Sequence, residues 1–246
     1  MNRTITVNPL ALRAVMPCAG SRDVRFYLNT VALFKGKAGG VLAVATDGNV
    51  MAFCFDPVGH WEGDDAGPVL IRRTNDGNSA STWKNSILAD VAALKPGRKD
   101  TPRACTLTTA GSMASLSFSG VERSHPSAVE LARYPDLTPY ATPRYSGELA
   151  AYNPELLARA FEGPQACGNH KGAHAVLLQN GKEAGTVVGM YDETAGTGLR
   201  YAAVVMPLRL PQGREAHPAV QSQGVEYVER TAPGVEWLAA AFGVTP

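Results

Sequence analysis

The chain has 246 residues, of which 45% are hydrophobic and 18% are charged, and its formal net charge is +1. This length allows one or two domains with a sizeable core, and the near-neutral charge excludes a protein coated in positive charge, although one basic face would still suit nucleic acid. No apolar run approaches the roughly 18 residues that span a bilayer and the N-terminus lacks an apolar signal core, so we expect a soluble, cytoplasmic protein.

The first elements in the chain are a strand, a helix and an apolar meander. Residues 4–7 alternate as a short strand, and Asn8-Pro9 begins a helix, because Asn accepts at the N-cap and Pro suits the first helical position. Pro17 should end that helix. Apolar runs bounded by Gly and Asp-Gly turns follow, which is typical of antiparallel strands. We expect strands at 26–34, 41–45 and 50–55, then a surface loop at 56–67.

The same order of elements recurs twice. The second pass has an expected strand at 68–73, a helix at 82–94, strands at 105–109, 113–119 and 128–132, and a Pro-rich connector at 133–143. The third pass has a strand at 148–152, a second Asn-Pro helix start at 153–154, a helix at 155–161 and strands at 173–179, 186–191 and 200–210. The sequence therefore predicts an α+β chain of strand–helix–three-strand repeats. A strand at 225–228 and a short helix at 235–242 are expected in the remainder.

Separated motifs in this chain resemble those of the bacterial sliding DNA clamp, the β subunit of the replicative polymerase. Asp23-Val24-Arg25-Phe26-Tyr27-Leu28-Asn29 and Val44-Ala45-Thr46-Asp47-Gly48 stand where that family carries D-V-R-Y-Y-L-N-G and V-A-T-D-G-H-R-L-A. Arg133-Tyr134-Pro135-Asp136 resembles R-F-P-D-Y, and residues 204–210 (VVMPLRL) resemble V-V-M-P-M-R-L. Asn49 and Val50 replace the His and Arg that the family usually has at the turn.

The resemblance implies clamp-like repeats, with antiparallel sheets outside and helices on one face that lines a hole. It divides the chain into a clamp-like domain at 1–143 that is similar to the family's middle domain, half of a second domain at 144–211 that is similar to the end of its last domain, and a C-terminal extension at 212–246. The family has an even number of repeats per subunit and this chain shows three. The oligomeric state therefore does not transfer from the resemblance.

The resemblance also implies a function without catalysis and without a cofactor. Such a protein holds duplex DNA as a homo-oligomeric ring, with a clamp loader as a further partner, and recruits polymerase or repair proteins through short peptides. In the family those peptides bind a hydrophobic groove, where a few apolar anchors dominate the affinity. Carried over position by position, the groove is Leu28, Thr46, Gly48, Asn49, Val50, Met51, Pro135, Tyr140, Val204, Val205, Met206, Pro207 and Leu208. Ordinary strand and core positions are the alternative interpretation of these residues.

DNA contacts in the family come from a loop before the first signature strand and from basic residues on the helices. The corresponding residues here are Arg22, Arg25, Phe26 and Tyr27, with Arg13, Lys84 and Arg159 on the expected helices. Contacts of this kind to phosphate are independent of base sequence and weaken with salt, which suits sliding. Solvated surface charge is the alternative for each of them.

Other chemistry has weaker signals in the sequence. Cys167, His170 and His174 have a spacing that can bind zinc, but no fourth ligand lies near them in sequence. The four cysteines form no CxxC pair and are expected to be reduced, mostly buried thiols. No G-x-S-x-G, Walker or HExxH motif is present, and Asp64-Asp65 is an isolated acidic pair.

Two other functional classes remain open on the sequence. One is a clamp-derived phage or plasmid protein that binds clamp partners without encircling DNA. The other is an unrelated enzyme assembled from distant residues on a repeated α+β scaffold. The oligomeric state separates the first of these from a ring, and a polar cleft with clustered acids or histidines would favour the second.

Overall fold

The computed structural model describes residues 2–21, 23–63, 67–72, 87–94, 104–111, 113–118, 121–125, 134–167, 175–182, 184–190, 197–208 and 228–244. In chain order its elements are β1 (Asn2–Val7), α1 (Pro9–Val15), η1 (Met16–Cys18), η2 (Phe26–Asn29), β2 (Thr30–Lys35), β3 (Val41–Thr46), β4 (Val50–Asp56), β5 (His60–Gly63), β6 (Val69–Arg72), α2 (Ile87–Ala93), β7 (Cys105–Ala110), β8 (Met113–Phe118), β9 (Val121–His125), η3 (Thr138–Tyr140), β10 (Arg144–Tyr145), α3 (Pro154–Cys167), β11 (Ala175–Leu178), β12 (Thr186–Met190), β13 (Arg200–Val205), β14 (Arg230–Thr231) and α4 (Trp237–Phe242).

The two Asn-Pro pairs begin helices, as the sequence predicts. The backbone N–H of Leu10 donates to Asn8 Oδ1 at 3.0 Å, and the backbone N–H of Glu155 donates to Asn153 Oδ1 at 2.9 Å. Each side chain thus satisfies an N–H that has no partner inside its helix. Helix α1 ends at Val15 and continues as the 3-10 turn η1, which contains Pro17.

A seven-stranded antiparallel sheet forms the centre of the molecule, in the order β11-β12-β13-β4-β3-β2-β6. Strands β3 and β4 are buried along their whole length, because both faces of the sheet are covered. Alternate residues such as Ala43 and Cys54 belong to a core on one face, while Leu42, Val44 and Phe53 belong to a second core on the other. Strands covered on both faces give continuous apolar runs, which explains the meander in the sequence.

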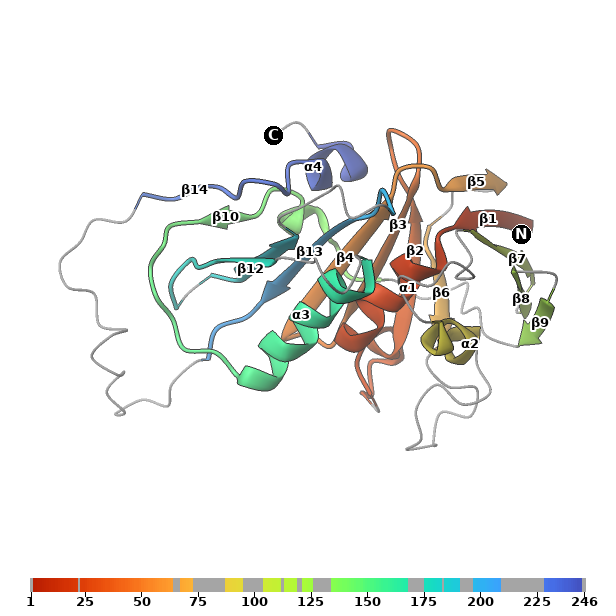
Figure 1. Cartoon of the computed structure of the whole chain (residues 1–246), viewed down its shortest axis with the longest axis horizontal. Helices are drawn as coiled ribbons and strands as arrows, with labels where there is room; N and C mark the ends of the chain where they lie inside the picture. Colours follow the sequence, from red (N-terminus) through yellow and green to blue (C-terminus); the bar gives the residue numbers. More distant parts are fainter. Residues whose placement is uncertain are drawn as a thin grey trace.

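The repeats exchange strands with one another. Strand β6, from the second pass, pairs with β2 of the first, and β1 of the first pass pairs with β7 of the second. Strands β11 to β13, from the third pass, extend the sheet by pairing β13 with β4. A second sheet, in the order β5-β1-β7-β8-β9, lies beside the large one (Figure 1). Among the described strands, each of the two large sheets therefore combines strands from more than one repeat.

Helices α1 and α3 pack together on one face of the large sheet (Figure 1). Leu12 and Val15 of α1 and Ala160 of α3 belong to the same core as the sheet residues beneath them. The hydroxyl of Tyr201 on β13 donates to the carbonyl of Ala160 at 2.8 Å, which ties α3 to the sheet through a fully buried side chain. The α+β architecture of antiparallel sheets and a shared helix face is the one expected from the sequence.

Near the end of the chain, α4 lies on the opposite face of the sheet. Trp237 of α4 stacks on Phe55 with ring centroids 6.0 Å apart, and Phe242 meets Phe53 edge-on at 6.0 Å. Lys37 donates its backbone N–H to the Ala241 carbonyl at 3.1 Å. The helix expected at 235–242 is thus confirmed, and it covers the apolar outer face of β3 and β4 instead of joining α1 and α3.

Several expected element boundaries are wrong. Residues 26–29 form η2 and not the start of a strand, because Asn29 turns back to donate to the Asp23 carbonyl at 2.8 Å. The expected loop at 56–67 contains β5, which pairs with β1. Residues 148–152 form no strand, and α3 runs on to Cys167 through Pro164. The strands expected at 128–132 and, for most of its length, 225–228 lie outside the described residues.

We predict that Gly163→Ala destabilises the protein by about 1–3 kcal/mol, the usual cost of overpacking a core. A Cβ at Gly163 would overlap the buried Tyr201 ring, and it would also crowd Pro164. This outweighs the gain of up to about 1 kcal/mol that Ala brings to a helix. Urea unfolding measures the change.

Gly189→Ala on β12 is the matched control. Its Cβ would meet only Val235 Cγ1 at 3.6 Å, an ordinary contact, so the substitution should not destabilise the protein and should add up to about 1 kcal/mol, because Ala has less backbone freedom to lose on folding. Equal effects of the two substitutions would contradict the close packing of α3 on β13.

Candidate functional site

We call the core on the α4 face of the large sheet, which contains Leu42, Val44 and Phe53, the outer core. A small pocket opens at the edge of the outer core, where β4 begins and β13 ends. We call it the groove pocket; its volume is about 170 Å³. Chain segments that are far apart in sequence contribute to it: the η2 region, the β3–β4 turn, the η3 connector and the end of β13. Its lining residues are Arg25, Tyr27, Leu28, Thr46, Gly48, Asn49, Val50, Met51, Pro135, Asp136, Tyr140, Val204 and Met206.

The β3–β4 turn forms one wall of the groove pocket. Asp47 Oδ1 accepts the backbone N–H groups of Asn49 and Val50 at 2.8 and 3.0 Å, and Thr46 Oγ1 donates to the Val50 carbonyl at 2.8 Å. Gly48 has a φ of +92°, a conformation that L side chains rarely adopt, so glycine is needed there. Local hydrogen bonds therefore fix the shape of this wall.

The opposite wall is held against the turn by strand pairing. Val204 is paired with Met51 and Val205 with Val50 in the β13–β4 register. Beyond the strand, the backbone N–H of Met206 donates to the Asn49 carbonyl at 2.8 Å. The register thus places the Val204 and Met206 side chains beside the turn.

The η3 connector supplies the third side. Leu137 is buried in the outer core, and the Tyr140 N–H donates to its carbonyl at 2.9 Å. Asp136 accepts the backbone N–H of Thr138 at 2.9 Å, and this bond lowers the pKa of its carboxyl group. Pro135 and Tyr140 are thereby presented to the pocket.

Most residues that the resemblance assigned to a groove therefore gather around one pocket. Three of them do not line it. Val205 is fully buried in the core between the large sheet and helices α1 and α3, and Pro207 and Leu208 follow β13 without lining the pocket. Leu208 is 45% exposed. Arg25 and Tyr27, expected as DNA contacts, line the pocket instead, as does Asp136, which the sequence argument named only as part of a motif. The sequence signal that could have placed these three residues in the pocket was their position beside groove residues in the clamp-like motifs.

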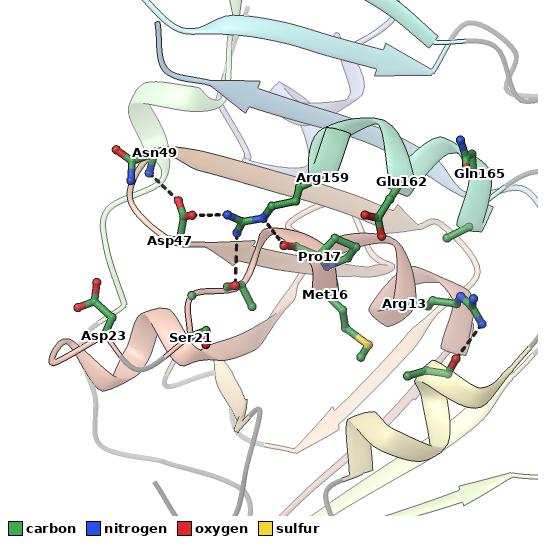
Figure 2. A pocket seen from close by; sticks show the side chains of 14 residues that line it. Arg13, Met16, Pro17, Ser21, Asp23, Asp47, Asn49, Arg159, Glu162 and Gln165 are labelled. Atoms are coloured by element: carbon green, nitrogen blue, oxygen red, sulfur yellow. Dashed lines mark hydrogen bonds and ion pairs between the residues drawn. The ribbon is translucent and has the colours of Figure 1, made fainter. Parts of the chain in front are cut away.

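A larger hollow lies on the helix side of the same turn, between α1, α2, α3 and η1 (Figure 2). We call it the helix-side hollow; its volume is about 790 Å³. Glu162 and Gln165 of α3 line one side, together with Arg159 (Figure 2). Asn49 lines both this hollow and the groove pocket, so the turn is the partition between them.

Three basic residues expected to bind DNA have protein partners. Arg159 pairs with Asp47 at 2.6 Å, and Arg25 makes a bidentate pair with Asp23 at 2.9 and 3.0 Å. The hydrogen bonds from Arg25 lower the pKa of Asp23 to about 2. Arg13 donates to the Ala92 carbonyl of α2 at 3.0 Å. Some of the N–H donors of all three arginines are therefore already used by acceptors within the protein.

The described members of the expected DNA-contact set lie on two sides of the β3–β4 turn. Arg13 and Arg159 line the helix-side hollow, while Arg25 and Tyr27 line the groove pocket on the other side of the turn. Phe26 is 48% exposed and packs edge-on against Tyr27, with ring centroids 6.1 Å apart. Arg22 and Lys84 lie outside the described residues.

The candidate zinc ligands are only partly described. Cys167 is buried at the end of α3, with its sulfur 3.5 Å from that of Cys54, while His170 and His174 lie outside the described residues, as do Asp64 and Asp65. Within the described ranges, no three His, Cys, Asp or Glu side chains gather as a metal site requires. Among the helices described, none has the length and apolar character needed to cross a membrane.

Comparison with known proteins gives a likeness in fold. No family model and no curated protein matches the chain. Among solved structures, a Helicobacter pylori beta clamp in complex with carprofen aligns with a TM-score of 0.58 at 12% identity, covering 85% of this chain and 67% of the clamp. The DNA polymerase III beta subunit of Thermotoga maritima gives 0.54 at 14% identity, covering 85% and 66%. That of Pseudomonas aeruginosa gives 0.52 at 15% identity, covering 84% and 66%. The chain thus has a sliding-clamp-like fold and spans about two thirds of the length of these neighbours.

We predict that all four cysteine thiols are unreactive toward a disulfide reagent at pH 8 in the folded protein. All four are buried, and burial raises the pKa of both Cys18 and Cys105 to about 12. Since the thiolate is the nucleophile, only about one molecule in 10,000 carries it at such a site at pH 8. The release of thionitrobenzoate measures the reaction, and four equivalents should appear on unfolding.

A Val58→Cys variant supplies the positive control, because Val58 is 84% exposed in a loop. It should give one fast equivalent without denaturant. A fast equivalent from the unaltered protein would show that one of the thiols is accessible.

Proposed function

We propose that this protein is a sliding-clamp-like tethering factor that holds duplex DNA and recruits polymerase or repair proteins through the groove pocket. The observation that supports this most directly is the pocket itself. It joins the signature residues Leu28 and Gly48, the connector residue Pro135, and Val204 and Met206 from the end of β13. The likeness in fold to bacterial clamps supports the same proposal.

The chemistry of the groove pocket suits an extended peptide with apolar anchors. Leu28, Met51 and Val204 provide an apolar floor, and the carboxylate of Asp136 and the guanidinium of Arg25 stand at the polar rim. An apolar floor with a polar rim is the usual arrangement where a few anchor residues carry the binding energy. No catalytic step is part of this proposal.

DNA binding is the part of the proposal that depends on the helices. In a ring of this type the helix face would meet phosphates through Lys and Arg, with a strong salt dependence. The helices α1, α2 and α3 carry the cations Arg13 and Arg159 and the acids Asp90, Glu155 and Glu162. This face is therefore close to neutral within the described helices.

The near-neutral charge of these described helices favours a second candidate function. In it, the protein is a clamp-derived module that binds the peptides of clamp partners without encircling DNA. The groove pocket would then act in the same way, but the protein would bring its partner to a different place. The two candidates differ in their DNA binding and oligomeric state, not in the peptide they bind.

We predict that Met206→Ala weakens binding of a polymerase-tail peptide by roughly five- to thirtyfold, since losing an apolar anchor contact costs about 1–2 kcal/mol. Met206 lines the groove pocket and its backbone is already fixed by the Asn49 carbonyl. Isothermal titration or fluorescence anisotropy with a labelled peptide measures the affinity.

Leu208→Ala is the matched control, because Leu208 is an apolar residue of the same segment that does not line the pocket. Its affinity for the peptide should stay within twofold of that of the unaltered protein. Equal losses at the two positions, or none at either, would reject the groove pocket as the binding site.

We predict that the protein assembles into a homo-oligomer and stays on nicked circular DNA but is lost when the circle is linearised. Topological holding by a closed ring gives this pattern, whereas direct phosphate contact is lost with salt on either form of DNA. Native mass measurement at micromolar concentration gives the oligomeric state. A strictly monomeric protein that still binds the peptide would instead support the second candidate.

A further inference from the structure

The turn between β3 and β4 is shared by the groove pocket and the helix-side hollow. Gly48 and Val50 line the groove pocket, Asp47 lines the hollow, and Asn49 lines both. Anything that holds the turn from the hollow therefore also sets the position of the groove wall.

Arg159 holds this turn from the hollow (Figure 2). Its Nη1 donates to Asp47 Oδ2 at 2.6 Å, while the other carboxylate oxygen of Asp47 accepts the N–H groups of Asn49 and Val50. One carboxylate thus links a guanidinium on α3 directly to the backbone of the groove wall. Charge-assisted bonds of this kind are the strong ones, and the two side chains are only 27% and 16% exposed.

The same guanidinium is also linked, through η1, to the η2 side of the groove pocket. Its Nε donates to the Pro17 carbonyl at 2.6 Å and its Nη2 to the Ala19 carbonyl at 3.4 Å. The next residue, Gly20, donates its N–H to the Leu28 carbonyl at 2.7 Å, and Leu28 lines the pocket. A planar guanidinium can reach acceptors in these directions at once, whereas the ammonium of a lysine cannot.

We infer that Arg159 is a positioning residue for the groove pocket, acting through Asp47 and η1 from the opposite side of the turn, and not a DNA contact. This inference rests on the proposed function of the pocket in peptide binding. Each of the three guanidinium nitrogens already donates to an acceptor within the protein, so these bonds direct the side chain toward Asp47 and η1. The groove then depends on α3, which belongs to the third repeat.

Two substitutions test the link from its two ends. Arg159→Gln removes the charge, and Asp47→Asn removes the ion pair while leaving an oxygen to accept from Asn49 and Val50. Each should weaken polymerase-tail peptide binding on the order of tenfold, and the double variant should be no weaker than the worse single one, because partners in one network are not additive. If Arg159→Gln fails to fold, Asp47→Asn carries the test.

Arg159→Lys and Arg13→Gln complete the set. Lysine keeps the charge but donates from a single nitrogen, which cannot span the three separate acceptors, so the Arg159→Lys variant should bind the peptide more weakly than the unaltered protein. Arg13 lines the same hollow but donates to α2, so Arg13→Gln should leave peptide affinity within twofold. A loss at Arg13 equal to that at Arg159 would overturn the inference, since it would show a general effect of the hollow.

Amide hydrogen exchange in the free protein gives a readout that needs no peptide. The N–H groups of Asn49, Val50 and Met206 should exchange roughly tenfold faster in Arg159→Gln, because local opening becomes easier. Their exchange rates should be unchanged in Arg13→Gln. Unchanged exchange at all three would overturn the inference. Faster exchange in a protein whose unaltered form binds no peptide would uphold the positioning role and reject the proposed function.

The DNA alternative has its own signature. If Arg159 contacts phosphate, its removal should lower the salt slope of DNA binding by about one and leave peptide affinity and amide exchange unchanged. That result would overturn the inference.

Discussion

The antiparallel pairing of β13 with β4 is the interaction on which the rest of the structure depends. It joins residues 200–205 to residues 50–55, and it carries α3 onto α1 on one face of the sheet. It also brings the start of β4 and the end of β13 to the same edge, where the Met206 N–H donates to the Asn49 carbonyl. The groove pocket lies at that edge, and the helix-side hollow lies on the other side of the same turn. Three repeats that exchange strands thus give one continuous sheet with two different cavities at one turn.

Much of this arrangement could be predicted from the sequence, where local chemistry determines it. The Asn-Pro pairs begin α1 and α3, because each Asn side chain caps its helix. The β3–β4 turn forms at Asp47–Gly48, because Gly48 adopts the positive φ that the turn needs. The grouping of the groove residues followed from the resemblance to clamps. Periodicity could not show that residues 26–29 curl into η2, because a side-chain bond from Asn29 to the Asp23 carbonyl decides it. Nor could it place α4, since an apolar helix is equally suited to either apolar face of the sheet.

The charged residues show most clearly that sequence alone does not reveal which partners a side chain has in the folded protein. Arg25, Arg159 and Arg13 were all consistent with DNA contact in the sequence, yet each has an acceptor within the folded chain. The partner of Arg159 lies 112 positions away in the sequence, so no local pattern could reveal it. The distinction matters for function, because an arginine paired with a carboxylate holds the fold in position and adds little net positive charge to the surface. Among the described helix cations, Arg159 is paired in this way with Asp47.

The interleaving of the strands also has a consequence for synthesis on the ribosome. Strand β4 is made early, yet its partner β13 is complete only when residue 205 has emerged. Until then β4 has one unpaired edge, and both of its faces are apolar. An exposed apolar edge is a template for pairing with other chains, and pairings between distant residues form slowly. A nascent or truncated chain that stops before β13 therefore exposes the edge at which aggregation would begin, and chaperone binding during translation would protect that edge.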